Sequence, residues 1–151
     1  MMSSIIWFTG QPGSGKTTIA IDLIKKLNAN NISNVMHIDG DDLRDLTSNK
    51  DYSKKGRIKN IELAQKIALF CANKGFHVIV SLVAPFKEVR DKFKNKNNVI
   101  EFYLQTTDIR GKEHFFSDDY APPTDNFIEI DTGKNNLDES VDIVMNNVDL
   151  K

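Results

Sequence analysis

Short apolar runs alternate with segments of helical periodicity along this chain. The runs are typical of strands and lie at residues 5–8, 35–38, 77–83, 99–104 and 127–130. Between them, apolar residues recur at the spacing of helices that bury one face, at residues 17–27, 58–73, 86–93 and 137–148. A shorter helix is expected at residues 43–46, and Lys74-Gly75 is expected to end the longest helix.

This alternation predicts an α/β fold in which a five-stranded parallel sheet lies between two layers of helices. The run at 77–83 is continuously apolar, as expected of a strand that is buried on both faces of such a sheet. Ligands of parallel sheets bind at the carboxyl ends of the strands. Polar residues follow the strands at that edge, at Thr9-Gly10, Asp39-Gly40-Asp41, Ala84-Pro85 and Gln105-Thr106.

A phosphate-loop motif follows the first apolar run. Residues Gly10 to Thr17 fit G-x-x-x-x-G-K-[ST] at every fixed position, between a predicted strand and a predicted helix. This context predicts a P-loop nucleoside triphosphate hydrolase-type fold that binds ATP and Mg²⁺. Lys16 is expected to reach the β- and γ-phosphates, and the Thr17 hydroxyl to ligate Mg²⁺. The nucleotide-binding residues are predicted to be Gly13, Ser14, Gly15, Lys16, Thr17 and Thr18.

Composition narrows the class of protein further. The chain has 151 residues, which suits one domain, residues 1–151. Its 20 basic and 21 acidic residues leave a net charge of −1, so no overall field favours nucleic acid or an anionic membrane. Cys71 is the one cysteine, and the N-terminus lacks the pattern of a signal peptide. We therefore expect a soluble, cytoplasmic protein that binds neither nucleic acid nor membranes.

An acidic sequence, Asp39-Gly40-Asp41-Asp42-Leu43-Arg44, follows the second run. Next to a phosphate loop, one carboxylate suits the Mg²⁺ shell, and another can orient an acceptor hydroxyl and take its proton. Arg44 can clamp an anionic substrate. The plainer alternative is an acidic turn at the start of a short helix, with Asp41 or Asp42 as the N-cap.

At this point the chain resembles adenylylsulfate (APS) kinases over nearly its whole length. The resemblance is carried, in order, by Trp7-Phe8-Thr9-Gly10, Asp39-Gly40-Asp41-Asp42-Leu43-Arg44, Tyr52-Ser53 with Arg57 and Asn60, Val80-Ser81-Leu82-Val83 before Ala84-Pro85-Phe86, Glu101-Phe102-Tyr103-Leu104, and Asp118-Asp119-Tyr120-Ala121-Pro122-Pro123 leading to Ile130-Asp131-Thr132. In that family, ATP phosphorylates the ribose 3′-hydroxyl of adenylyl sulfate.

The resemblance implies roles for single residues. Lys16, Asp41 and Asp39 would be catalytic, with Asp41 as the general base. Asp39 would support the metal and its water, together with Thr17. The residues that would hold the sulfate–phosphate part of the acceptor and stack on its base are Arg44, Arg57, Asn60, Tyr52 and Phe115 (or Phe116).

The chain also departs from the family. The family's lid is shortened in residues 105–126, where only Arg110-Gly111-Lys112 remains of its basic sequence, and Ala84 replaces a serine that some members phosphorylate. Outside the motifs, His37 and His77 are expected to be ordinary strand residues. The lysine-rich stretch at 87–96 is typical of a solvated helix face, although Arg90 could turn toward the nucleotide.

The sequence therefore predicts a small-molecule kinase that transfers the γ-phosphoryl group of ATP to a nucleotide acceptor such as adenylyl sulfate. One alternative is a kinase of another diphosphate-linked nucleotide, for example a cytidine diphosphate derivative used in the synthesis of surface polysaccharides. Another is a nucleotide-binding module that does not transfer phosphate. Whether the chain forms a homodimer is left open.

Overall fold

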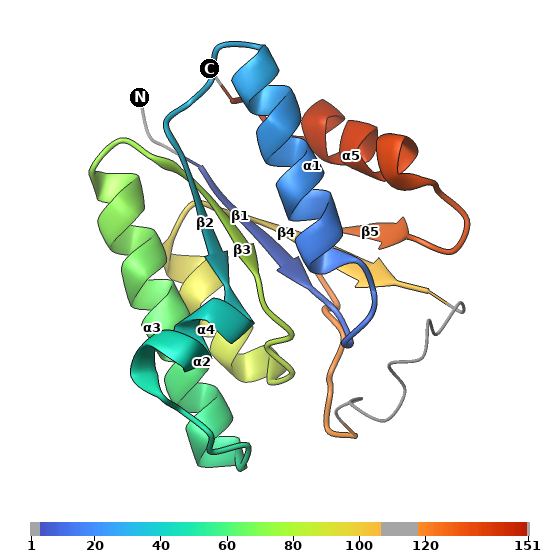
Figure 1. The fold of residues 1–151 in the computed structure, drawn as a ribbon. Helices are drawn as coiled ribbons and strands as arrows, with labels where there is room; N and C mark the ends of the chain where they lie inside the picture. The colour runs from blue at the N-terminus through green and yellow to red at the C-terminus, as the bar shows by residue number, and fades with distance from the viewer. Residues whose placement is uncertain (1–3, 107–117, 151) are drawn as a thin grey trace.

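The computed structural model describes residues 4–106 and 118–150 as one parallel sheet with helices on both faces (Figure 1). The strands are β1 (Ile5–Thr9), β2 (Val35–Asp39), β3 (His77–Ser81), β4 (Val99–Gln105) and β5 (Phe127–Asp131). The helices are α1 (Lys16–Ala29), α2 (Gly40–Thr47), α3 (Lys54–Asn73), α4 (Lys87–Lys96) and α5 (Leu137–Asn146). Within the described residues, no helix is long and apolar enough to span a membrane.

The sheet has five strands in the order β2-β3-β1-β4-β5, and every neighbouring pair is parallel. Figure 1 shows α1 and α5 on one face of the sheet and α2, α3 and α4 on the other. The predicted three-layer fold is therefore confirmed. After β1, the chain forms β2 and β3 on one side of it and then crosses to β4 and β5 on the other side. The carboxyl end of β1 is therefore the switch point at which such sheets bind ligands.

Alternation along β1 separates two hydrophobic cores. Ile5 and Trp7 pack with α3 and α4 residues such as Ile61 and Phe93. Ile6 and Phe8 face the other way and belong to the core formed with α1 and α5, through residues that include Ile19, Leu23, Val141 and Val144. Because β1 is central, all five of its residues are buried, and the strand holds the phosphate loop that follows it in a fixed place.

Several predicted boundaries differ from the structure, and three of them have a local physical reason. The helix expected at 43–46 begins at Gly40, and the helix expected from 58 begins at Lys54, because Asp39 and Ser53 cap their first turns through side-chain oxygens. The suggestion that Asp41 or Asp42 is the N-cap is therefore wrong. The third strand ends at Ser81, not Val83, since its register with Phe8 and Asp39 ends there.

Candidate active site

A cavity of about 500 Å³ lies at the carboxyl ends of β1, β2 and β3. It brings together most of the residues that the sequence proposed for both substrates. Its lining includes the phosphate-loop residues Gly13, Lys16 and Thr17, the acidic residues Asp39 and Asp41, and the predicted acceptor residues Arg44, Tyr52, Arg57 and Asn60. Phe115 and Phe116 lie outside the described residues, as do Arg110, Gly111 and Lys112.

The phosphate loop has the backbone conformation that its glycines allow. Gly13 has a φ of 82° and Gly15 a φ of 100°, a region that side chains disfavour. Gly15 is also the N-cap residue of α1, so the first N–H groups of that helix open toward the loop. Ser14 is buried, and its carbonyl accepts a hydrogen bond of 2.8 Å from the Thr132 hydroxyl. Thr18 lies in the first turn of α1 and is exposed.

Lys16 is almost buried, with 8% of its surface exposed. Its ammonium group donates to the carbonyls of Gly10 and Gln11, each at 2.9 Å, so it lies across the loop that it belongs to. Its positive charge and its position on the cavity wall suit it to a phosphate oxygen, for which it would exchange one of its hydrogen bonds within the loop. The predicted direction of Lys16, toward the ligand cavity, agrees with this lining position.

Asp39 is the centre of a hydrogen-bond network at the end of β2. Its Oδ1 accepts from the hydroxyls of Thr17 and Ser81, each at 2.9 Å, and its Oδ2 accepts from the Asp41 amide at 3.1 Å. The Ser81 hydroxyl donates its hydrogen to Asp39. It therefore accepts the 2.7 Å hydrogen bond that it makes with His37, and the Nε2 of His37 carries the proton. Burial lowers the pKa of His37, which favours the neutral imidazole.

The donor set at Thr17 and Asp39 fits Mg²⁺. A hydroxyl and a carboxylate are hard oxygen ligands, and Mg²⁺ in nucleotide sites commonly takes one or two such side chains together with phosphates and waters. Within residues 4–106 and 118–150, no three His, Cys, Asp or Glu side chains gather into a metal cluster. Thr17 and Asp39 are the residues that would hold the ion, together with the nucleotide.

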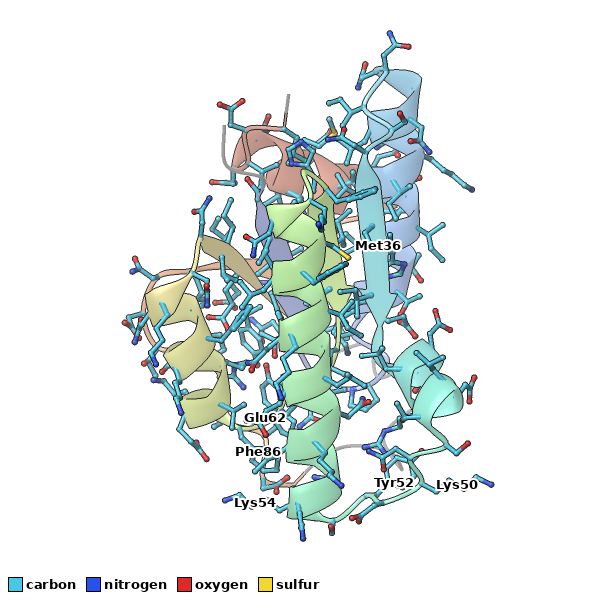
Figure 2. All side chains as sticks on the ribbon, turned by 90° about the vertical axis from the view of Figure 1, so that its left-hand side faces the viewer. Met36, Lys50, Tyr52, Lys54, Glu62 and Phe86 are labelled. Carbon is cyan, nitrogen blue, oxygen red and sulfur yellow. The ribbon has the colours of Figure 1, made fainter. Side chains whose placement is uncertain are left out.

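Arg44 is engaged by the α2–α3 loop. Its Nη1 donates to the carbonyls of Asn49 and Asp51, each at 3.2 Å. Its guanidinium lies 4.1 Å from the centre of the Tyr52 ring, a cation–π contact. Tyr52 is 64% exposed, and Figure 2 shows it near the start of α3. The pair therefore presents a supported aromatic face at the mouth of the cavity.

Arg57 and Asn60 lie one turn apart on α3, which starts beside the cavity. Arg57 forms a 3.0 Å ion pair with Asp119. Asn60 is buried, and its Nδ2 donates to the Gly40 carbonyl at 3.4 Å. Its buried Oδ1 has no partner among the described residues, so it can accept a hydrogen bond from a ligand or a water.

The sequence missed several residues of the site. Ser81 and the loop residues Leu82, Val83 and Pro85 line the cavity; they belong to a segment that carries the resemblance, but none of them was predicted to bind a substrate. Arg90 and Lys94 were expected on a solvated helix face, but their side chains are 3% and 9% exposed and pair with Glu101. Arg90 Nε lies 3.3 Å from Glu101 Oε2, and Lys94 Nζ lies 2.7 Å from Oε1. That expectation is wrong for these two residues because a carboxylate in the middle of β4 requires cations beside it.

The fold and the site define a phosphotransferase of the P-loop class, because a parallel α/β sheet presents a phosphate loop and paired carboxylates in one cavity. The chain belongs to the adenylylsulphate kinase family, whose sequence profile matches residues 2–114. It is accordingly an ATP-dependent kinase that uses Mg²⁺ and transfers phosphate to an alcohol group.

Relatives and solved structures agree with this family. A cytidine diphosphoramidate kinase from Campylobacter jejuni is 30% identical, over 93% of this chain and 94% of the relative. A probable adenylyl-sulfate kinase from Pseudomonas aeruginosa is 31% identical, over 93% of this chain and 75% of the relative. The Mycobacterium tuberculosis APS kinase in complex with AMPPNP and APS shares the fold, with a TM-score of 0.83, 24% identity and 96% of each chain covered.

Proposed function

We propose that this protein transfers the γ-phosphoryl group of ATP to the ribose 3′-hydroxyl of a nucleotide acceptor such as adenylyl sulfate. The observation that carries the proposal is the single cavity of about 500 Å³, which is lined at one end by Lys16 and Thr17 and elsewhere by Asp41, Tyr52 and Arg57. One volume therefore holds groups for a triphosphate, a proton and an anionic acceptor. Direct transfer between two bound nucleotides requires this arrangement.

The phosphate-loop end would bind ATP. The loop amides and the N-terminus of α1 would hold the phosphates, and Lys16 would neutralise charge on the transferring group. Thr17 and Asp39 would hold Mg²⁺ directly or through water. When bound, the ion supplies positive charge that bridges the phosphates and orients them.

Asp41 is proposed as the group that orients the acceptor hydroxyl and accepts its proton. Its amide is fixed by Asp39 at 3.1 Å, whereas its carboxylate has no hydrogen-bond or ion-pair partner within the described part of the chain. Asp41 also lines the cavity and is exposed to it. Asp39, in contrast, is occupied by three donors, so the structure favours different tasks for the two carboxylates.

The acceptor would lie between α2 and the start of α3. Arg57 would contact its anionic group. Arg44 would either contact the same group or hold the Tyr52 ring, on which its guanidinium packs. Tyr52, with Phe115 from outside the described residues, would stack on the base. The unpartnered Oδ1 of Asn60 accepts hydrogen bonds, so it suits a hydroxyl of the acceptor or a bound water better than an anion.

A second candidate acceptor is a cytidine diphosphate derivative. The cytidine diphosphoramidate kinase of C. jejuni aligns with nearly all of this chain and with nearly all of its own length. The site residues described above suit either nucleotide, because stacking on Tyr52 tolerates any base and Arg57 contacts any anionic group. The two candidates therefore share one mechanism and differ in the base and in the terminal group.

The test is acceptor-dependent formation of ADP. Purified protein with MgATP is offered adenylyl sulfate, cytidine diphosphate derivatives and matched 3′-deoxy analogues. The proposal predicts ADP release with one class of acceptor and none with its 3′-deoxy analogue. Release that does not depend on an acceptor would indicate an ATPase, and MgATP binding without turnover would indicate a nucleotide-binding module.

We also propose that residues 1–151 act as one kinase domain, that residues 105–126 form its shortened lid, that the protein works in the cytoplasm, and that it can form a homodimer. A hexameric APS kinase from Thiobacillus denitrificans, which shares the fold with a TM-score of 0.76, shows that chains of this fold assemble. Light scattering of the purified protein, with and without MgATP, tests the assembly.

A further inference from the structure

The loop between β3 and α4 forms one wall of the cavity without regular secondary structure. Its residues Leu82 to Pro85 line the cavity beside Arg57 and Asn60. Three consecutive carbonyls of this wall each accept a hydrogen bond from a different part of the chain, namely Val83 from the Thr9 hydroxyl at 2.8 Å, Ala84 from Arg90 Nη1 at 2.6 Å, and Pro85 from the Ala121 amide at 2.9 Å.

These three hydrogen bonds hold an unfavourable backbone conformation. Ala84 has a φ of 45°, in the left-handed region that residues with a Cβ avoid, and only 1% of its surface is exposed. Such a conformation persists where the surroundings over-determine it, and it is concentrated at ligand sites. The shape of this wall is therefore set by its donors and not by the intrinsic preference of its residues.

Arg90 is the donor that joins the wall to a second segment. Its side chain is 3% exposed and comes from α4, behind the wall. While Nη1 bonds the Ala84 carbonyl, Nη2 donates to the Ala121 carbonyl at 2.5 Å. The planar guanidinium can reach both carbonyls at once, which the single ammonium of a lysine cannot do in the same geometry.

The second segment carries further contacts to the site. Arg90 lies 5.4 Å from the centre of the Tyr120 ring. The Tyr120 hydroxyl is 2.8 Å from the Thr9 hydroxyl, which donates its own hydrogen to Val83, so Tyr120 is the donor of that contact. Asp119 is the ion-pair partner of Arg57. Residues 119–121 therefore bond both to the wall and to a proposed acceptor residue.

We infer that Arg90 is a positioning residue for the acceptor: by bonding Ala84 and Ala121 together, it sets the shape of the cavity wall and the place of the segment that pairs with Arg57. The inference rests on the proposed function, since it assigns the wall to the acceptor and not to ATP. Arg90 does not line the cavity, so it acts through the backbone that it holds.

A simpler role for Arg90 would be to neutralise Glu101, which is 3% exposed. Lys94 separates the two roles, because its ammonium bonds the other oxygen of Glu101 at 2.7 Å, lies 3.9 Å from Asp91 Oδ1, and donates to the carbonyls of Asp125 and Asn126. Lys94 therefore shares the ion pair but not the wall. Lys94→Met is the matched control for a change at Arg90.

The test compares Arg90→Lys with Lys94→Met in steady-state kinetics. Arg90→Lys keeps a cation for Glu101 and loses the double contact, so we expect the acceptor KM to rise about tenfold while the KM for ATP stays within about twofold. Lys94→Met should lower thermal stability and leave both constants near the wild-type values. An unchanged acceptor KM in folded Arg90→Lys would overturn the inference, as would an equal rise in Lys94→Met.

Hydrogen exchange of the protein without ligands gives a second measurement that needs no acceptor. The Ala121 amide, which bonds Pro85, should exchange about tenfold or more faster in Arg90→Lys than in wild type, and at the wild-type rate in Lys94→Met. Unchanged exchange at Ala121 in Arg90→Lys would also contradict the inference. If no acceptor supports turnover in the wild type, the proposed function fails, and the exchange result still decides the role of Arg90.

Discussion

The Thr17 hydroxyl donates a hydrogen bond to Asp39 Oδ1 at 2.9 Å, which ties the first turn of α1 to the end of β2. The two residues are 22 positions apart, and each belongs to a different motif. The contact makes the phosphate loop and the acidic sequence parts of one site. It also brings together a hydroxyl and a carboxylate, the two oxygen ligands that we propose for Mg²⁺.

Asp39→Asn is expected to weaken the binding of Mg²⁺ more than any other property. The amide keeps the size of the side chain, but it places a neutral group where two hydroxyls now donate to a carboxylate. The Mg²⁺ concentration for half-maximal activity should rise about tenfold or more. Titration of Mg²⁺ into the protein with ADP, followed calorimetrically, measures the same change without turnover. An unchanged Mg²⁺ requirement would remove Asp39 from the metal site.

Asp41→Asn is expected to act on turnover. Because the proposed role is to orient the hydroxyl and accept its proton, kcat should fall by ~10²–10⁴-fold while ATP binding changes little. Single-turnover kinetics with saturating acceptor measure the loss. If Asp39→Asn is the severe variant and Asp41→Asn the mild one, the two roles are reversed.

Lys16→Ala is expected to leave the fold intact and to lower phosphoryl transfer by about two orders of magnitude or more. Lys16 donates hydrogen bonds to Gly10, Gln11 and Ser14 of its own loop, and it is not part of either hydrophobic core. Circular dichroism and thermal unfolding provide the control for folding. Wild-type transfer in a folded Lys16→Ala protein would contradict the assignment of the phosphate loop.

The order of strands and helices was predictable because burial leaves a strong periodic signal. A strand that is buried on both faces is apolar at every position, as residues 5–8 are, because successive side chains enter different cores. Each helix shows one apolar face. The phosphate loop and the acidic residues were predictable because their chemistry restricts residue types at fixed spacing. In the structure, Lys16, Asp41 and Arg57 line one cavity.

The contacts made through the backbone were not predictable. Nothing in the composition of residues 87–96 distinguishes Arg90 and Lys94 from the exposed lysines around them, because their partner Glu101 lies on another element. The hydrogen bonds of Arg90 go to the carbonyls of Ala84 and Ala121, which every residue type offers. Helix starts were missed for a similar reason, since the cap of α3 depends on one hydroxyl, that of Ser53.

Tyr120 provides a prediction at alkaline pH. Burial of the phenol raises the pKa of Tyr120 from its ordinary value of 10.0 to about 12. The folded protein therefore holds this proton more tightly than the unfolded chain does. The stability that it contributes is complete below pH 10 and is lost as the pH rises through 12. The slope should reach ~1.4 kcal/mol per pH unit.

Tyr120→Phe removes this titration. Its free energy of unfolding should be about 1 kcal/mol lower at neutral pH, because the bond to Thr9 is lost, and it should fall less steeply than that of the wild type between pH 10 and 12. Urea unfolding followed by the fluorescence of Trp7, which is 3% exposed, measures both. Equal slopes in the two proteins would mean that the phenol is not protected in the fold.

Figure 2 shows Tyr52 near the start of α3, where Lys54 lies 5.2 Å from the centre of the Phe86 ring. Arg57 follows on the same helix. If it binds the acceptor anion, Arg57→Ala should raise the acceptor KM about ten- to a hundredfold, since a charged hydrogen bond contributes ~1.5–3 kcal/mol. The KM for ATP should hardly change.

Asp119→Asn is the matched control, because it removes the charge that pairs with Arg57 at 3.0 Å and keeps the arginine. If Arg57 binds the acceptor, its guanidinium must leave Asp119 to pair with the substrate anion. Asp119→Asn makes that step easier, so this variant should have an acceptor KM equal to or lower than that of the wild type. An arginine that serves only the ion pair gives similar losses of stability in both variants and no change in the acceptor KM. An unchanged acceptor KM in Arg57→Ala would place the anion elsewhere, most simply on the segment between β4 and β5.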